Sequence, residues 1–242
     1  MSKPTEQIYK NYTTEDFNVW KTLFNRQMEA LRPTVSVSYL EAIERIGFTD
    51  IQIPDFAVVN KILDTTTGWK IEVVPNICPD AKFFECSANG IFTSTCWLRM
   101  MSQLDYLEEP DMFHDVFGHM PLLTNKAYAD FFRDFGKVAV RFIDNPEAIQ
   151  LLSRIYWYTI EFGMIEENNE LKIYGAGIIS SFGETKHAID NKTQKLPFDI
   201  DEIMSTPYRT DIIQDKYFVI HSFEQLYQSI AKIEEKLAER FS

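Results

Sequence analysis

The chain has 242 residues, of which 45% are hydrophobic and 25% charged, a composition typical of one soluble globular domain with a large core. Its 36 acidic and 24 basic residues give a formal net charge of −12 with no basic run, so neither nucleic acid nor an anionic membrane is an expected partner. Three cysteines without zinc-type pairing are typical of reduced thiols in a cytoplasmic protein.

The N-terminal part is predicted to be mainly helical. Residues 1–12 are polar, lack the apolar segment of a signal peptide and are expected to be flexible. Thr13 is typical of a helix N-cap because acidic residues follow it in the first turn. Apolar residues then recur at helical spacing up to Pro33, and a second apolar stripe predicts a helix over residues 39–46.

Short strands and further helices follow. Apolar alternation and short apolar runs predict strands at 69–74, 92–98 and 216–220. Apolar stripes predict helices at 126–142, from 146 to about 165, and at 222–241. No stretch is apolar for long enough to span a bilayer. Because helices dominate and the strands are short, we expect a mainly α (α+β) fold in which residues 13–242 form a single domain.

The segment 110–123 contains two of the four histidines, His114 and His119. On a regular α-helix, residues five positions apart point about 140° away from each other, so the two rings could not share one face. Gly118 can leave helical geometry easily, and Pro121 disfavours helical conformation in the residue before it. We therefore predict that His114 projects from the end of a helix and His119 from the unwinding chain beyond it, where their rings can converge.

Glu161 lies in an aromatic run, residues 156–163, whose other members include no cation. A buried carboxylate without a partner is unfavourable, so it should either take up a proton or bind a cation. Two imidazoles and one carboxylate can occupy one face of an iron(II) ion and leave the opposite positions free for oxygen chemistry. The residues His114, His119 and Glu161 therefore predict a non-haem iron site.

Two other interpretations fit the histidine spacing. On spacing alone, a pair of histidines is more often structural than metal-binding. A zinc hydrolase would usually place its histidines four positions apart with a glutamate between them as general base. Here the spacing is five, and the acid between the histidines is Asp115, directly after the first of them. These differences favour an oxygenase over a hydrolase.

Several longer segments carry a resemblance to a known family. The most specific are Tyr-Leu-Glu-Glu-Pro-Asp at 106–111, which leads into the histidines, the aromatic run at 156–163, and Tyr-Gly-Ala-Gly-Ile-Ile-Ser-Ser-Phe-Gly-Glu at 174–184. In these segments and their order, the chain resembles the pterin-dependent aromatic amino acid hydroxylases, most of all their short bacterial phenylalanine 4-monooxygenases. The resemblance extends over most of the chain, from residue 12 to residue 220.

The resemblance implies a reaction and its cofactors. Members of this family hydroxylate the ring of an aromatic amino acid with O2 and a tetrahydropterin, such as tetrahydrobiopterin, at a non-haem Fe(2+) ion. For this chain it implies that L-phenylalanine becomes L-tyrosine, and that His114, His119 and Glu161 hold the iron. Tryptophan-specific members tend to have phenylalanine where Trp157 stands, and tyrosine-specific members have aspartate near Thr210. The alternatives are therefore a tryptophan or tyrosine hydroxylase, or an inactive binding module of the same fold.

The resemblance also assigns residues to the two organic ligands. For the substrate it implies that Arg99 grips the carboxylate of the amino acid and that Trp157 forms a wall of the ring pocket. Ser180 would hold a ligand histidine, and Glu184 follows in the same segment, which we expect to be a loop. The residues implied for pterin binding are Phe83, Asp115 and Tyr156, with Phe84 as the alternative to Phe83 for the ring that stacks on the pterin.

The resemblance further implies how the chain is organised. Residues 13–242 correspond to the catalytic domain of the family, and neither a regulatory domain nor a tetramerisation segment is recognised. We therefore expect a monomer that binds only small molecules, namely the amino acid and the pterin.

Overall fold

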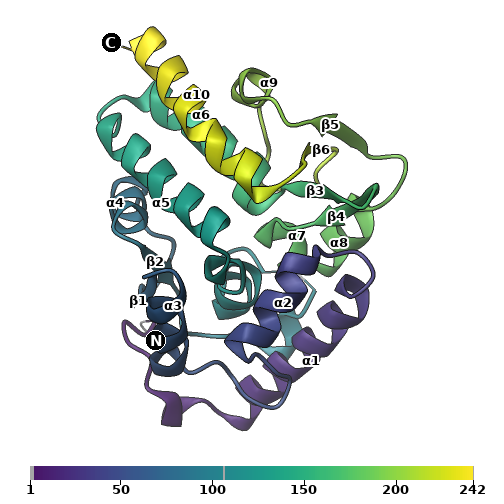
Figure 1. Cartoon of the computed structure of the whole chain (residues 1–242). Helices are drawn as coiled ribbons and strands as arrows, with labels where there is room; N and C mark the ends of the chain where they lie inside the picture. The colour runs from purple at the N-terminus through teal and green to yellow at the C-terminus, as the bar shows by residue number, and fades with distance from the viewer. Residues whose placement is uncertain (1–2, 106, 242) are drawn as a thin grey trace.

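The computed structural model describes residues 3–105 and 107–241, and the expected mainly α fold is confirmed (Figure 1). The α-helices are α1 (Thr14–Leu31), α2 (Val37–Ile46), α3 (Phe56–Thr66), α4 (Asp80–Ala88), α5 (Lys126–Arg141), α6 (Pro146–Tyr156), α7 (Ala176–Ser180), α8 (Phe182–Ala188), α9 (Ile200–Ser205) and α10 (Phe223–Phe241). The strands are β1 (Lys70–Val73), β2 (Ile91–Ser94), β3 (Met164–Glu167), β4 (Glu170–Ile173), β5 (Gln194–Pro197) and β6 (Lys216–Ile220). Two π-helical segments, Phe113–His119 and Trp157–Glu161, stand apart from these regular elements.

The first helix begins where its sequence predicts. The Thr13 hydroxyl accepts a hydrogen bond from the backbone N–H of Asp16, and the Asp16 carboxylate accepts one from the backbone N–H of Thr13. This reciprocal capping satisfies two N–H groups that the first helical turn would otherwise leave unpaired. Gln7, Tyr9 and Tyr12, from the segment expected to be flexible, also form hydrogen bonds to the rest of the domain, with Pro54, Ile53 and Cys96 respectively.

The strands form two small sheets. β1 and β2 pair in parallel, and four strands form a second sheet in the order β4-β3-β6-β5, in which only the β3–β4 pair is antiparallel. The strands expected at 69–74 and 216–220 are confirmed, whereas the one expected at 92–98 ends at Ser94. The sequence analysis did not predict the β3–β4 hairpin. Asn168 and Asn169 at its turn both adopt positive φ, which asparagine tolerates better than most residues.

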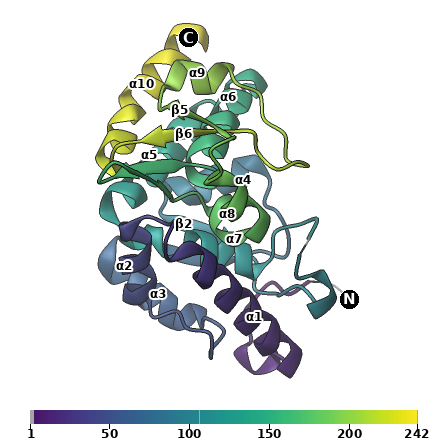
Figure 2. The ribbon, with the colours of Figure 1, turned by 90° about the vertical axis from the view of Figure 1, so that its right-hand side faces the viewer.

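The helices enclose the segment that carries the histidines. In both views α1, α2 and α3 lie at one end of the molecule and α6, α9 and α10 at the other (Figures 1 and 2). Between them the π-helical segment Phe113–His119 lies in the core, where Phe113 stacks on Phe117 with ring centroids 4.6 Å apart. Trp20 meets Phe113 edge-on at 5.5 Å, and the Tyr39 hydroxyl donates to the Phe117 carbonyl at 2.7 Å. These aromatic contacts and this hydrogen bond hold the segment in place within the core.

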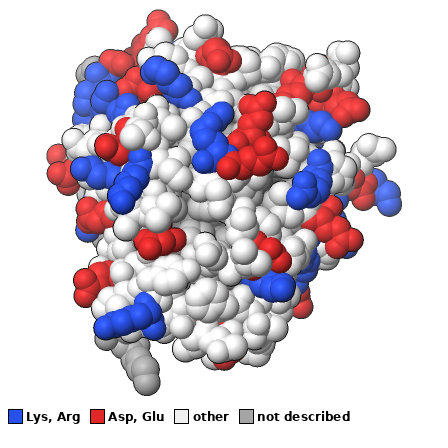
Figure 3. All heavy atoms as spheres, turned by 60° about the horizontal axis from the view of Figure 1, so that its bottom comes forward, with Lys and Arg blue, Asp and Glu red and all other residues white. Residues whose placement is uncertain are grey.

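The surface carries charges of both signs. On the face in Figure 3, lysine and arginine side chains lie among aspartates and glutamates. Among residues 3–105 and 107–241, no helix combines the length and the apolar character needed to cross a membrane.

We expect Gly163→Ala to destabilise the fold strongly. A Cβ atom at Gly163 would lie 2.1 Å from the Tyr174 ring and 2.3 Å from the Thr159 carbonyl oxygen, and neither the buried ring nor the backbone can move away freely. The loss of unfolding free energy should exceed about 2 kcal/mol. Urea denaturation measures it, with Gly183→Ala as the control because the nearest atom there, in Ile213, is 3.8 Å away. Equal midpoints for the two variants would contradict the prediction.

Candidate metal centre

The two histidines converge by a different route from the one expected from the sequence. The chain does not unwind at Gly118; the helix instead widens into a π-helix over Phe113–His119, and Met120 also keeps helical dihedral angles. In a π-helix, hydrogen bonds join residues five apart, so His114 and His119 are one turn apart on the same face. The glycine serves close packing, because a Cβ atom there would lie 3.1 Å from the Ala176 carbonyl oxygen.

Glu161 arrives on a second π-helical turn. α6 continues directly into the segment Trp157–Glu161, and the Phe162 N–H donates to the Trp157 carbonyl five residues back, at 2.8 Å. The helix therefore ends at Glu161, a few residues before the expected end near 165. All three predicted ligands are thus displayed by π-helical turns, a form of helix that is frequent at functional sites.

The three side chains converge on one point. The Nε2 atoms of His114 and His119 are 3.4 Å apart, and the Glu161 carboxylate oxygens lie 3.2 Å from His119 Nε2 and 3.7 Å from His114 Nε2. Ligand atoms that bind one metal at about 2.1 Å and at right angles are about 3.0 Å apart, so these separations suit a single ion. The donor set of two nitrogens and one oxygen fits iron(II), and the alternative of two unrelated structural histidines does not explain the convergence.

Burial and mutual interactions set the charges of the three groups. Burial lowers the pKa of His114 to about 4, although the Glu161 carboxylate opposes this shift. Burial alone would raise the pKa of Glu161, but the two imidazoles and hydrogen bonds from His119 and Tyr156 outweigh it and lower the pKa to about 2. A neutral His114 and an anionic Glu161 at neutral pH are the forms that coordinate a cation.

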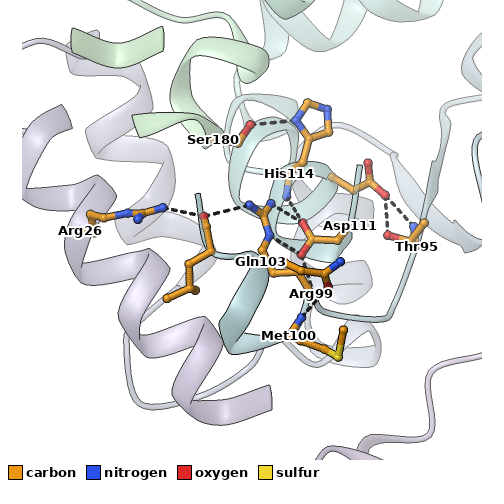
Figure 4. A network of polar contacts seen from close by, with 10 residues as sticks. Arg26, Thr95, Arg99, Met100, Gln103, Asp111, His114 and Ser180 are labelled. Carbon is orange, nitrogen blue, oxygen red and sulfur yellow. Dashed lines mark hydrogen bonds and ion pairs between the residues drawn. The ribbon is translucent and has the colours of Figure 1, made fainter. Parts of the chain in front are cut away.

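Ser180 holds one of the two histidines in place. Its hydroxyl lies 2.8 Å from His114 Nδ1, and Figure 4 shows it at the side of the ring. If Nε2 bound a metal, Nδ1 would carry the proton and donate a hydrogen bond to the Ser180 hydroxyl oxygen, which would fix the orientation of the ring. Among the residues that the structure describes, His119 Nδ1 has no such protein partner. Ser180 itself lies at the end of α7, so the segment expected to be a loop is helical over α7 and α8.

Ser180→Ala should therefore weaken iron binding about tenfold, because His114 would lose the contact that orients its ring. Titration of the metal-free protein with Fe(II) under anaerobic conditions measures the affinity. Ser205→Ala removes an exposed hydroxyl that donates a hydrogen bond to the Glu202 carbonyl oxygen, and serves as the control. An unchanged affinity in Ser180→Ala would show that Ser180 does not support the ligand.

Arg99 is held by a partner that the sequence analysis did not single out. Nε and Nη2 of Arg99 donate to the two carboxylate oxygens of Asp111 at 2.9 and 2.8 Å, and Asp111 is fully buried (Figure 4). A guanidinium has five N–H donors, and this bidentate pair uses two of them. Asp111 also accepts from the backbone N–H groups of Arg99 and His114, so it links the arginine directly to a metal-site histidine. The sequence offers one sign of this role of Asp111, because it is an acidic residue three positions before His114.

Of the predicted pterin residues, Tyr156 interacts with Glu161, and Phe83 packs on Tyr156. Phe83 is half-buried and meets Tyr156 edge-on, with ring centroids 5.3 Å apart. A hydrogen bond from Tyr156 is one of the interactions that lower the pKa of Glu161. Phe84 is buried and packs on Phe135 instead, which favours Phe83 as the ring available for stacking.

Asp115 lies on the same π-helical turn as the histidines. Its carboxylate accepts hydrogen bonds from the backbone N–H and the hydroxyl of Thr95, at 2.7 and 2.9 Å. Burial raises its pKa to about 7, although these hydrogen bonds oppose the shift.

The remaining substrate candidates form a separate cluster. Trp157 stacks on Tyr208 with centroids 4.5 Å apart and packs on Phe162 at the same distance. Glu184 does not reach the triad; its two oxygens accept hydrogen bonds from the Gln214 N–H at 3.0 Å and the Tyr217 hydroxyl at 2.8 Å. Because the Trp157 indole N–H donates to the Gln214 side chain, hydrogen bonds connect Glu184 to Trp157 through Gln214.

The sequence is similar to those of known enzymes over most of its length. The chain is 44% identical over 226 residues to the phenylalanine-4-hydroxylase of Chromobacterium violaceum, covering 93% of this chain and 76% of that protein. It is 42% identical over 225 residues to the enzyme of the same name from Ralstonia nicotianae, covering 93% and 72% respectively.

A solved structure extends the likeness to the fold. The crystal structure of the C. violaceum enzyme with bound iron(III) and 7,8-dihydrobiopterin superposes with a TM-score of 0.90 at 42% identity, over 98% of this chain and 87% of that one. Residues 3–242 match the sequence profile described as biopterin-dependent aromatic amino acid hydroxylase. The chain therefore belongs to the family of biopterin-dependent aromatic amino acid hydroxylases.

Proposed function

We propose that this protein is a phenylalanine 4-monooxygenase, which converts L-phenylalanine into L-tyrosine with O2 and a tetrahydropterin at a non-haem iron(II) ion. The observation that carries this proposal is the convergence of His114, His119 and Glu161 in a chain whose relatives are named phenylalanine-4-hydroxylases. These three side chains would hold the ion from one side, which would leave its other positions for oxygen and water.

The two cofactors and the residues of the protein have different roles in the reaction. Iron and the reduced pterin supply the site and the electrons for O2 activation, which no side chain of this protein can provide. The residues of the chain position these groups: His114, His119 and Glu161 would hold the ion, and Phe83 offers the half-buried ring on which the flat pterin could stack.

Arg99 and Trp157 orient the amino acid. Asp111 occupies one edge of the Arg99 guanidinium, and the N–H groups on the outer edge can bind the carboxylate of the amino acid bidentately. The half-buried Trp157 then offers an aromatic wall for the ring. Gripping the carboxylate and packing the ring together fix the position of the carbon to be hydroxylated relative to the metal.

Phenylalanine is favoured over tryptophan and tyrosine by two positions. Trp157 is a tryptophan rather than the phenylalanine typical of tryptophan-specific members, and Thr210 is not the aspartate typical of tyrosine-specific ones. The complete ligand triad favours an active enzyme over a binding module of this fold.

The purified protein tests the proposal directly. With Fe(II), tetrahydrobiopterin and O2, it should form tyrosine from phenylalanine and turn over tryptophan and tyrosine far more slowly. A chelator added before the iron should abolish product. Failure to turn over any of the three amino acids with iron bound would identify a binding module and overturn the proposal.

We also infer that the protein acts as a single catalytic domain, residues 13–242, and as a monomer in the cytoplasm. Its partners would then be the amino acid and the pterin, without nucleic acid or a membrane. A reducing compartment is supported by three cysteines that form no disulfide in the part of the chain described. The exposed large apolar side chains are mostly scattered along the chain, with Met100–Met101 and Ile212–Ile213 as adjacent pairs, which supports a monomer; light scattering tests it.

A further inference from the structure

We propose that Gln214 is a positioning residue that sets the orientation of Trp157 and the shape of the loop before β6, and thereby the choice of amino acid. The inference rests on the proposed function and deepens it. Gln214 is 5% exposed and lies at the end of the loop 206–215, which connects α9 to β6. No feature of the sequence had singled it out.

The Gln214 side chain joins the indole to this loop. Its Oε1 atom accepts a hydrogen bond from Trp157 Nε1 at 3.0 Å. Its Nε2 atom donates to the carbonyl oxygens of Arg209 and Ile212, both at 2.9 Å. Both donors of the amide are therefore used, and its oxygen serves the indole. Rotation of the amide by half a turn would place donors against the indole N–H and an acceptor against the carbonyls, so this orientation is fixed.

The loop in turn covers the indole. Tyr208 stacks on Trp157 with an interplanar angle of 16°, and the Tyr158 hydroxyl donates to the Pro207 carbonyl at 2.9 Å. Because the Gln214 amide binds the carbonyls of residues 209 and 212, the loop between them is folded around one side chain. The orientation of Trp157 and the position of Tyr208 consequently depend on the same amide group.

The backbone of Gln214 is anchored independently. Its N–H donates to Glu184, whose other oxygen accepts from Tyr217, and the Tyr217 hydroxyl lies 3.2 Å from the Gln214 carbonyl oxygen. Both Glu184 and Tyr217 are buried. A fixed backbone and a fully used side chain leave Gln214 a single arrangement, which is what a positioning residue requires.

This arrangement links the two positions that distinguish substrates. Trp157 donates its indole hydrogen bond to Gln214, and Thr210 lies between the two residues whose carbonyl oxygens accept hydrogen bonds from Gln214. A buried indole N–H without an acceptor is unfavourable, so loss of the Gln214 oxygen would let the ring turn or shift. Loss of the two donors would release the loop around Thr210. We therefore expect Gln214 to control substrate choice through both positions at once.

The test is Gln214→Met, which keeps the length of the side chain and removes its hydrogen bonds. For the iron-loaded enzyme, we expect the KM for phenylalanine to rise about tenfold with a much smaller change in kcat. The ratio of kcat/KM for phenylalanine over tryptophan should fall by a similar factor, since the wall of the ring pocket is no longer fixed. In the metal-free protein, the Trp157 indole N–H signal, assigned by its absence in Trp157→Phe, should exchange with solvent at least about tenfold faster.

Gln225→Met is the matched control. Gln225, in α10, accepts a hydrogen bond through its side chain from the His221 N–H at 2.7 Å, and among the described residues no hydrogen bond joins this side chain to Trp157 or to the loop 206–215. It should leave the KM, the substrate ratio and the Trp157 signal unchanged. If Gln214→Met does not fold, Gln214→Glu keeps the acceptor for the indole and loses the donors to the loop; it should retain slow indole exchange and still lose selectivity.

The outcomes separate this inference from the proposed function. A native protein that forms no tyrosine overturns both. An active native protein in which Gln214→Met, or Gln214→Glu in its place, has the substrate ratio of the Gln225→Met control overturns the role of Gln214 alone. Altered selectivity with unchanged indole exchange in Gln214→Met would show that the residue does not act through Trp157, and would also overturn the inference.

Discussion

Replacing Glu161 with glutamine should lower both iron affinity and tyrosine formation at least about 100-fold while the fold is retained. The amide has nearly the same shape as the carboxylate but no charge, and it is a much poorer ligand for iron(II). At this position the loss is not compensated, because the other two ligands are histidines that Glu161 approaches at 3.2 and 3.7 Å.

Thermal unfolding provides an independent readout of this variant. A metal present at about 100 times its dissociation constant stabilises the native protein by about 2.7 kcal/mol, which corresponds to a rise of roughly 5–10 °C in Tm for a chain of this size. Glu161→Gln should show almost no rise. Glu166→Gln, five residues along the chain with an exposed carboxylate, should behave like the native protein. Full activity of Glu161→Gln at ordinary iron concentrations would disprove the ligand assignment.

The second large effect is expected for Arg99→Lys. Lysine keeps the positive charge beside Asp111 but cannot form the planar, bidentate pair with two carboxylates. The KM for phenylalanine should rise between about 10- and 100-fold, the value of one or two charge-assisted hydrogen bonds, while the KM for the pterin stays within about twofold. Steady-state kinetics with each substrate varied in turn measures both constants.

Lysine is preferable to alanine in this test. Arg99→Ala would leave the fully buried Asp111 carboxylate without its partner, which costs about 3–5 kcal/mol and would confuse binding with folding. Arg141→Lys, in a surface pair with Glu234, is the control and should leave both constants unchanged. Equal increases in the two constants for Arg99→Lys would show that Arg99 does not bind the amino acid selectively.

The grouping of His114, His119 and Glu161 could be predicted from the sequence because these residues are conspicuous. Two of the four histidines lie five residues apart, and Glu161 is an acid in an aromatic run that offers it no cation. Helices with strong apolar periodicity, such as α1 and α10, were also predicted close to their observed bounds. These features depend on local spacing, which a sequence displays directly.

The route by which the site is assembled could not be predicted in the same way. The π-helical turns have no simple sequence signal, so the regular α-helix was assumed and an unwinding at Gly118 was inferred wrongly. Short elements such as α7, α8 and the β3–β4 hairpin lack enough periodic positions to be recognised. Asp111 and Gln214 act through partners that are far away in the sequence or on another element, so only the folded chain reveals their roles.

The widened turns make the number of residues in these two segments as important as their identity. Adding one residue between His114 and His119 would rotate the second imidazole by about 100° relative to the first and carry it out of reach of the ion. The same holds for the chain between α6 and Glu161. An inserted residue in either segment would therefore separate the three side chains in a single step, whereas a substitution that keeps the number of residues leaves their spacing unchanged.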